Sequence, residues 1–219
     1  MRKGCSDGLT PAECLYILND YGEEERTREG MLAAILANLY ENNLIKFSEE
    51  RECKLTLTRK GKNALKTPQT LRSYEIERLE GIQDDDSEEI YYFDWEDIRK
   101  ELVKRGVMKK YAIEKPFKIF GKTIFTRRKV VYEYDPKVKE ILGKLKRMRD
   151  ELNTSIRRRK LERWINTYGK SMCYAFPSIA TTDGFKEVAE EIEDMVEWNE
   201  LLLIGACSVC AAILAAAED

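Results

Sequence analysis

The amino-acid sequence predicts a mainly α-helical protein in which short β-hairpins follow two of the helices. Apolar residues recur at helical spacing over most of the chain, and helix-capping residues stand at the starts of several of these segments. Short segments elsewhere alternate apolar and polar residues, which is typical of strands. The expected architecture is a compact helical domain with winged-helix-like units and one or two β-hairpins.

The first such unit is expected near the start of the chain. Thr10 and Pro11 are typical of the N-cap and first position of a helix, so a helix should begin there. A second helix should cover residues 31–44, where apolar residues recur every three to four positions. Alternation in residues 44–47 and 53–58 then predicts a hairpin. Helix, helix and hairpin together outline a winged-helix-like unit.

The order of helix and hairpin recurs in the middle of the chain. Asp94 is a typical N-cap, and a helix is expected over residues 95–104. Strands are expected over residues 107–113 and 117–134, the second folded about a tight turn at Gly121-Lys122.

Helices are also expected elsewhere along the chain, at 61–79 with a break near Pro68, and at 135–156, 161–175, 185–198 and 200–217. Residues 201–217 carry no charge. A helix of that length is roughly 25 Å long, shorter than the ~30 Å apolar core of a bilayer, so a buried helix is favoured over a membrane anchor. We expect a single domain over 1–219, with an N-terminal lobe at about 1–82, a basic lobe at about 90–160 and C-terminal helices at about 161–219.

The chain contains no histidine among its 219 residues. This excludes Ser-His and Cys-His nucleophilic pairs and His-ligated metal sites, so no enzyme activity, catalytic residue, metal site or cofactor is predicted. The six cysteines are scattered through a chain without a secretory signal, which favours a cytoplasmic protein with reduced thiols.

Positive charge is concentrated in one part of the chain. Residues 99–163 hold 23 Lys and Arg against 8 Asp and Glu, whereas the whole chain has a net charge of −2. At the centre of this segment, residues 115–129 interleave cations with apolar and aromatic side chains. Such a segment is suited to a partner that is both apolar and anionic, and an anionic membrane surface fits best.

The candidate contacts fall into two groups. Contact with the membrane or with a second copy of the chain is expected from Phe117, Ile119, Phe120, Ile124 and Phe125. Binding of lipid phosphates is expected from Lys118, Lys122, Arg127, Arg128 and Lys129.

Two segments resemble the Golgi phosphoprotein 3 family. Residues 30–45 (GMLAAILANLYENNLI) are similar to the glycine-led helix of that family, and residues 96–110 (EDIRKELVKRGVMKK) are its closest match. In that family a hydrophobic hairpin follows the second segment, as residues 117–125 do in this sequence. The resemblance implies a mostly α-helical peripheral membrane protein that binds phosphoinositides and associates with itself through the hairpin.

The resemblance also implies a headgroup site near the two helices. In the family, a Trp and an Arg near the first helix and an Arg pair at the second bind the headgroup. This sequence has Arg26 and Arg28 before the first helix, and it has Tyr92 and Trp95 where the Arg pair would stand. Together with Arg99, the residues Arg26, Arg28 and Trp95 are the candidate anion-binding residues outside the hairpin.

Two other functions are consistent with the same segment. Residues 115–129 could form the wing of a winged-helix-like nucleic-acid-binding protein, with Arg99 and its neighbours facing phosphates. Alternatively, exposed hairpin edges could pair with a second copy of the chain or with another subunit. The sequence does not decide whether the basic run 157–160 lies on the same face as the hairpin.

Overall fold

The computed structural model describes residues 8–24, 28–47, 55–85, 90, 94–120 and 122–176. Within these ranges the protein is mainly helical, with two separate antiparallel pairs of strands, as expected. The elements are α1 (Pro11–Asp20), α2 (Arg28–Glu41), β1 (Ile45–Phe47), β2 (Leu55–Leu57), α3 (Arg59–Lys66), η1 (Pro68–Thr70), α4 (Ser73–Asp84), α6 (Trp95–Lys104), β3 (Met108–Ile119), β4 (Lys122–Tyr134), α7 (Val138–Arg157), α8 (Leu161–Tyr168) and η2 (Ser171–Ala175). The expected helices at 185–198 and 200–217 lie outside the described residues.

The first unit follows the local signals in the sequence. Thr10 is the N-cap of α1, and Glu13 completes a capping box by accepting a hydrogen bond from the Thr10 N–H at 2.8 Å. The strands β1 and β2 pair antiparallel, which confirms the expected hairpin, and Leu55 and Leu57 both face the core.

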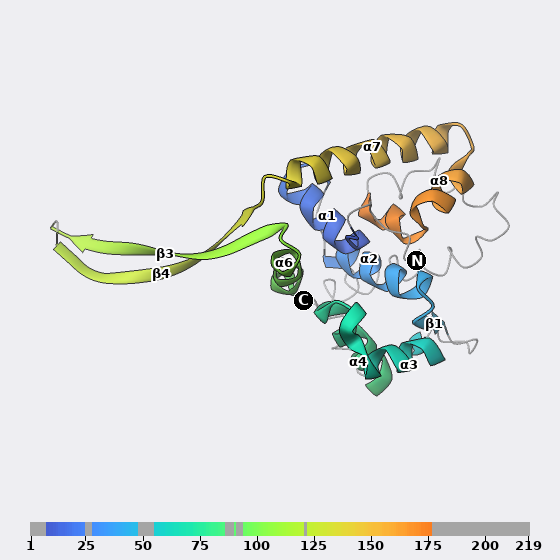
Figure 1. Ribbon diagram of the computed structural model, residues 1–219, viewed down its shortest axis with the longest axis horizontal. Helices are drawn as coiled ribbons and strands as arrows, with labels where there is room; N and C mark the ends of the chain where they lie inside the picture. The colour runs from blue at the N-terminus through green and yellow to red at the C-terminus, as the bar shows by residue number, and fades with distance from the viewer. Residues whose placement is uncertain are drawn as a thin grey trace, which may run out of the picture.

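Helix α2 lies at the centre of the described core. It contacts α1, β1 and η2, and most of its side chains are buried (Figure 1). Helix α7 lies across α1 at one side of the body and buries one stripe of its surface. That stripe consists of Val138, Ile141, Leu145, Met148, Leu152 and Ile156. Its spacing of three or four residues places all six on one face of the helix.

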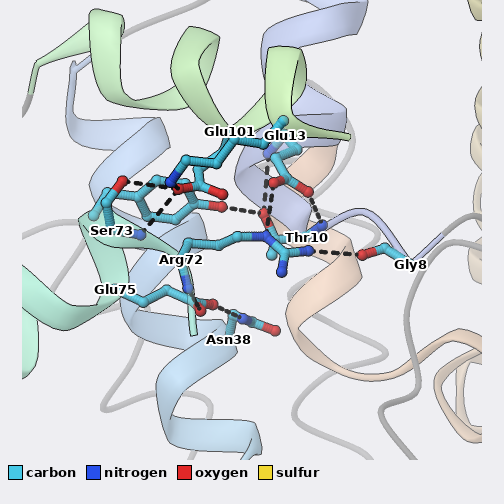
Figure 2. A network of polar contacts seen from close by, with 10 residues as sticks. Gly8, Thr10, Glu13, Asn38, Arg72, Ser73, Glu75 and Glu101 are labelled. Carbon is cyan, nitrogen blue, oxygen red and sulfur yellow. Dashed lines mark hydrogen bonds and ion pairs between the residues drawn. The ribbon is translucent and has the colours of Figure 1, made fainter. Parts of the chain in front are cut away.

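A buried polar network joins helices that are distant in the sequence (Figure 2). The Arg72 Nε donates to Glu13 Oε1 at 2.9 Å, and the Glu13 side chain is fully buried. Glu75 accepts a hydrogen bond from Asn38 of α2 at 2.6 Å. These contacts fix α1, α2 and α4 relative to one another, because each buried charge keeps its partner only in this arrangement.

The expected helix over residues 161–175 is interrupted. Helix α8 ends at Tyr168, and Gly169 adopts a φ of 96°, which favours glycine. Glu41 from the end of α2 accepts hydrogen bonds from the N–H groups of Lys170 and Ser171, at 2.7 and 3.0 Å. The break therefore comes from a tertiary contact that holds η2 against α2.

Gly61 in α3 lies too close to another backbone segment to accept a side chain. A Cβ at this position would stand 2.0 Å from the Leu44 carbonyl oxygen. We expect Gly61→Ala to lower the free energy of unfolding by about 1–3 kcal/mol, because the backbone of α3 must shift to relieve the overlap. Thermal denaturation measures this effect.

Gly143→Ala is the matched control for this prediction. Gly143 lies in α7 with nothing within 4 Å of the added Cβ, so we expect a small gain in stability from the higher helix propensity of alanine. Equal melting temperatures for the two variants would contradict the close approach at Gly61.

Candidate functional site

A long two-stranded β-ribbon projects from the helical body (Figure 1). It consists of β3 and β4, residues 108–134, and is called the arm below. The twelve residues of β3 extend roughly 40 Å at about 3.3 Å per residue. Beyond its base, the arm is outside the helical core, so none of the described helices covers its two faces or two edges.

The arm is more continuous than the sequence indicates. Residues 114–116 were expected to separate two strands, but they belong to β3, and Pro116 pairs with Thr126. Proline is tolerated because, within the described part of the chain, the ribbon has no third strand that would need the N–H that proline lacks. Lys122 was expected in the turn and is instead the first residue of β4.

Several expected contact residues occupy the outer end of the arm. Phe117 pairs with Phe125, and a bulge follows between Phe117 and Lys118. The side chains of residues 117–119 and 121–125 lie outside what the structure describes. Phe120, between the strands, is fully exposed and has a φ of 50°.

Of the two arginines expected near the first helix, Arg26 lies outside the described residues, and Arg28 is the first residue of α2.

Apolar side chains exposed to solvent are concentrated on the arm. Among the described residues, the large hydrophobic side chains that are exposed are Tyr21, Tyr111, Ile113, Phe120 and Val130. All except Tyr21 belong to the arm. Isolated exposed apolar residues are common on soluble proteins, but a concentration on one projecting element indicates a contact surface.

A group of four cations lies beyond the base of the arm, where Arg128 stands opposite Glu114 across the ribbon. Lys115, Arg127, Arg128 and Lys129 are all exposed. Among the described residues, none of these four forms an ion pair. Lys115 stands directly opposite Arg127 across the ribbon. Because like charges in opposed positions destabilise a sheet, an external anion would stabilise this part of the arm.

At its base the arm is held to helix α6 by aromatic and charged groups. The Tyr132 hydroxyl donates to Glu96, and the Arg99 guanidinium lies 5.5 Å from the Tyr132 ring centre. The Arg99 Nε also donates to the Tyr16 hydroxyl at 2.6 Å. Lys110 lies over the Tyr132 ring, and its pKa is raised by the Tyr132 hydroxyl and by Glu96, so it remains charged.

A second contact joins the arm to α1. The Tyr134 hydroxyl donates to Asp20 Oδ2 at 2.8 Å, and its ring lies 5.5 Å from that of Tyr21. Burial and the nearby Asp20 carboxylate raise the pKa of Tyr134, so the hydroxyl stays protonated and keeps this hydrogen bond at neutral pH. The arm is therefore anchored to two helices.

The structure divides the expected anion-binding residues into two sets. Arg127, Arg128 and Lys129 are exposed together on the arm. Arg99 instead joins the arm to the body, and Trp95 packs against Tyr16 with ring centres 6.4 Å apart. Lys115 and Tyr132 were not among the site residues expected from the sequence. The recurrence of tyrosine at positions 132 and 134 within an alternating strand is the signal that marks the base.

We expect Arg99→Ala to loosen the base of the arm without unfolding the body. The change removes the hydrogen bond to Tyr16 and two cation–π contacts, each worth about 0.5–1 kcal/mol at a partly exposed site. Amide hydrogen exchange at residues 108–112 and 130–134 should accelerate by roughly tenfold. Lys100→Ala on the same helix is the control, because Lys100 pairs with Asp97. Unchanged exchange at the base of the arm would contradict this anchoring role.

The basic run 157–160 is not part of the arm. Helix α7 follows the arm directly and is 20 residues long, so its far end lies roughly 30 Å from the arm base. The two basic regions are therefore separate surfaces.

No family model, curated protein or solved structure significantly matches this chain. None of the helices in the described part of the chain is long and apolar enough to cross a membrane.

Proposed function

We propose that this protein docks peripherally on an anionic membrane through the outer half of the arm. The observation that carries the proposal is the order of residue types along the ribbon. The end of the arm, residues 117–125, contains five large apolar residues interleaved with Lys118 and Lys122, and the exposed cations Lys115 and 127–129 follow immediately behind it. An element that enters a bilayer end-on needs apolar groups first and cations at the depth of the phosphates.

The expected binding energy is sufficient for reversible docking. Each Lys or Arg near an anionic surface contributes about 1 kcal/mol, so the four exposed cations contribute about 4 kcal/mol together. Phe120, which is fully exposed, adds about 1.5–3 kcal/mol if its ring becomes buried among acyl chains. Binding of this kind weakens as salt screens the charges.

The resemblance to the Golgi phosphoprotein 3 family supports the same proposal. The two similar segments form α2 and the beginning of β1 and, further along, α6 with the start of β3. A hairpin follows the second segment, as in that family. A phosphoinositide is accordingly one candidate among the anionic lipids.

Co-flotation with liposomes tests the proposal. The protein should float with phosphatidylserine-containing vesicles at low salt, float less at near-physiological salt, and remain unbound with phosphatidylcholine alone. Vesicles that carry a phosphoinositide, compared at equal surface charge, measure headgroup preference. Absence of flotation with every anionic vesicle would refute the proposal.

Nucleic-acid binding is the second candidate, favoured by the shape of the arm. A two-stranded ribbon fits the major groove of B-form DNA, and the cations at 127–129 would then face phosphates. Duplex DNA added to the flotation assay separates the two functions. Steeply salt-dependent DNA binding without flotation would establish this candidate in place of membrane docking.

A further inference from the structure

A second basic surface lies between α7 and α8 and is not used by the proposed function. Residues of both helices and of the turn between them line a groove of about 570 Å³. Its volume is within the range of about 300–1,000 Å³ that is typical of small-molecule sites. Figure 1 shows α8 on the side of the body away from the arm, so the groove and the arm are separate surfaces.

One end of the groove is cationic. Arg158, Lys160 and Arg163 line it at the turn between the helices, and all three are exposed. Among the residues that the structure describes, none of the three forms an ion pair. Elsewhere on α7, Lys146 and Arg149 both form ion pairs with Glu23, at 2.6 and 3.0 Å. The cations of the groove therefore retain their full charge for an anionic group.

The other end of the groove carries hydrogen-bond acceptors. Glu151 lines it and accepts a hydrogen bond from the Tyr168 hydroxyl at 2.7 Å, which ties α8 to α7 across the groove. The hydroxyls of Thr154 and Thr167 donate to carbonyls of their own helices, at 2.8 and 2.9 Å. Their oxygen lone pairs, together with the Asp150 carboxylate, are left to accept hydrogen bonds from ligand hydroxyls.

From this arrangement we infer that the groove binds a small phosphorylated polyol, with the phosphate at the cationic end and the hydroxyls at the acceptor end. Arg158, the C-cap of α7, stands seven positions after Glu151, a distance of about 10 Å along the helix axis. This span matches the length of a hexose phosphate. The mixture of charges explains why neither a simple anion nor an uncharged sugar is the expected ligand, since each would satisfy only one end.

Isothermal titration calorimetry of the full chain tests the inference with three probes. Glucose 6-phosphate should bind at least about tenfold more tightly than inorganic phosphate or glucose, because only it engages both ends. R158A/R163A should weaken glucose 6-phosphate binding by about tenfold or more. The control K139A/R147A removes two exposed cations of α7 outside the groove and should leave binding unchanged.

Two outcomes would overturn the inference: the absence of glucose 6-phosphate binding, or equal weakening in the groove variant and the control.

A phosphate next to hydroxyl groups also occurs in the glycerol phosphate headgroup of phosphatidylglycerol. Flotation with phosphatidylglycerol vesicles in the R127E/R128E/K129E background separates the two sources. If flotation persists in this background and R158A/R163A removes it, the groove binds a lipid headgroup. If glucose 6-phosphate binds but no flotation remains, the groove binds a free metabolite.

Discussion

The variant R127E/R128E/K129E should lose more than about a hundredfold in partitioning onto anionic liposomes. Three exposed cations that form no ion pair within the described residues contribute about 1 kcal/mol each to attraction, and every 1.4 kcal/mol is a factor of ten. The three added carboxylates also repel the anionic surface, which increases the loss. Flotation over a series of lipid concentrations measures the partition coefficient directly.

The fold of the arm should survive this change. Arg127→Glu replaces a like-charge pair with Lys115 by an attractive one, whereas Arg128→Glu opposes Glu114. These effects offset one another, and the body of the protein is not involved. Circular dichroism and amide exchange at the arm base confirm retention of the structure.

A matched control separates arm charge from net charge. K62E/K66E/R147E changes the net charge by the same amount at exposed positions on α3 and α7. We expect this control to retain most of its binding, because its charges lie outside the arm. If both variants lose binding equally, attraction by overall charge explains the affinity and the arm has no special role.

Replacing Arg72 by methionine should be the most destabilising single change in the polar network. Glu13 is fully buried and Arg72 is its ion-pair partner, so the substitution leaves a buried carboxylate uncompensated. Removal of one partner from a buried pair costs about 3–5 kcal/mol. For a chain of this size, the melting temperature should fall on the order of 10 °C, which calorimetry measures.

Two further variants test the cause of this loss. The double variant R72M/E13Q should recover part of the stability, because glutamine leaves no charge without a partner. Lys100→Met breaks the exposed pair with Asp97 and should cost less than about 1 kcal/mol. A similar loss for Arg72→Met and Lys100→Met would show that the network in Figure 2 contributes little to stability.

The elements that the sequence predicts well are those specified by neighbouring residues. Asp94 caps α6 by accepting a hydrogen bond from the Glu96 N–H at 2.9 Å, and Gly106 follows the helix with a φ of 70°. The apolar stripe of α7 likewise repeats every three to four residues. Capping and periodicity act within about one helical turn, so they can be read directly from the sequence.

The charges of the candidate site were predictable in part. The sequence indicates a basic hairpin and places Arg127, Arg128 and Lys129 on it. The pairing of Lys115 with Arg127 was not predictable, because the turn between Ile119 and Lys122 and the bulge after Phe117 set the register. A shift of one residue would oppose different side chains, and nothing local specifies it.

By itself, the sequence determined the helical class, most of the capped helices and the concentration of positive charge between residues 99 and 163. Only the tertiary structure decided that Arg72 pairs with Glu13, 59 positions away, and that Glu41 interrupts the helix after Tyr168. It also decided that Arg99 holds the arm and that α7 and α8 enclose a groove. Such contacts depend on which distant segments share a buried space, and that arrangement follows from packing of the whole core.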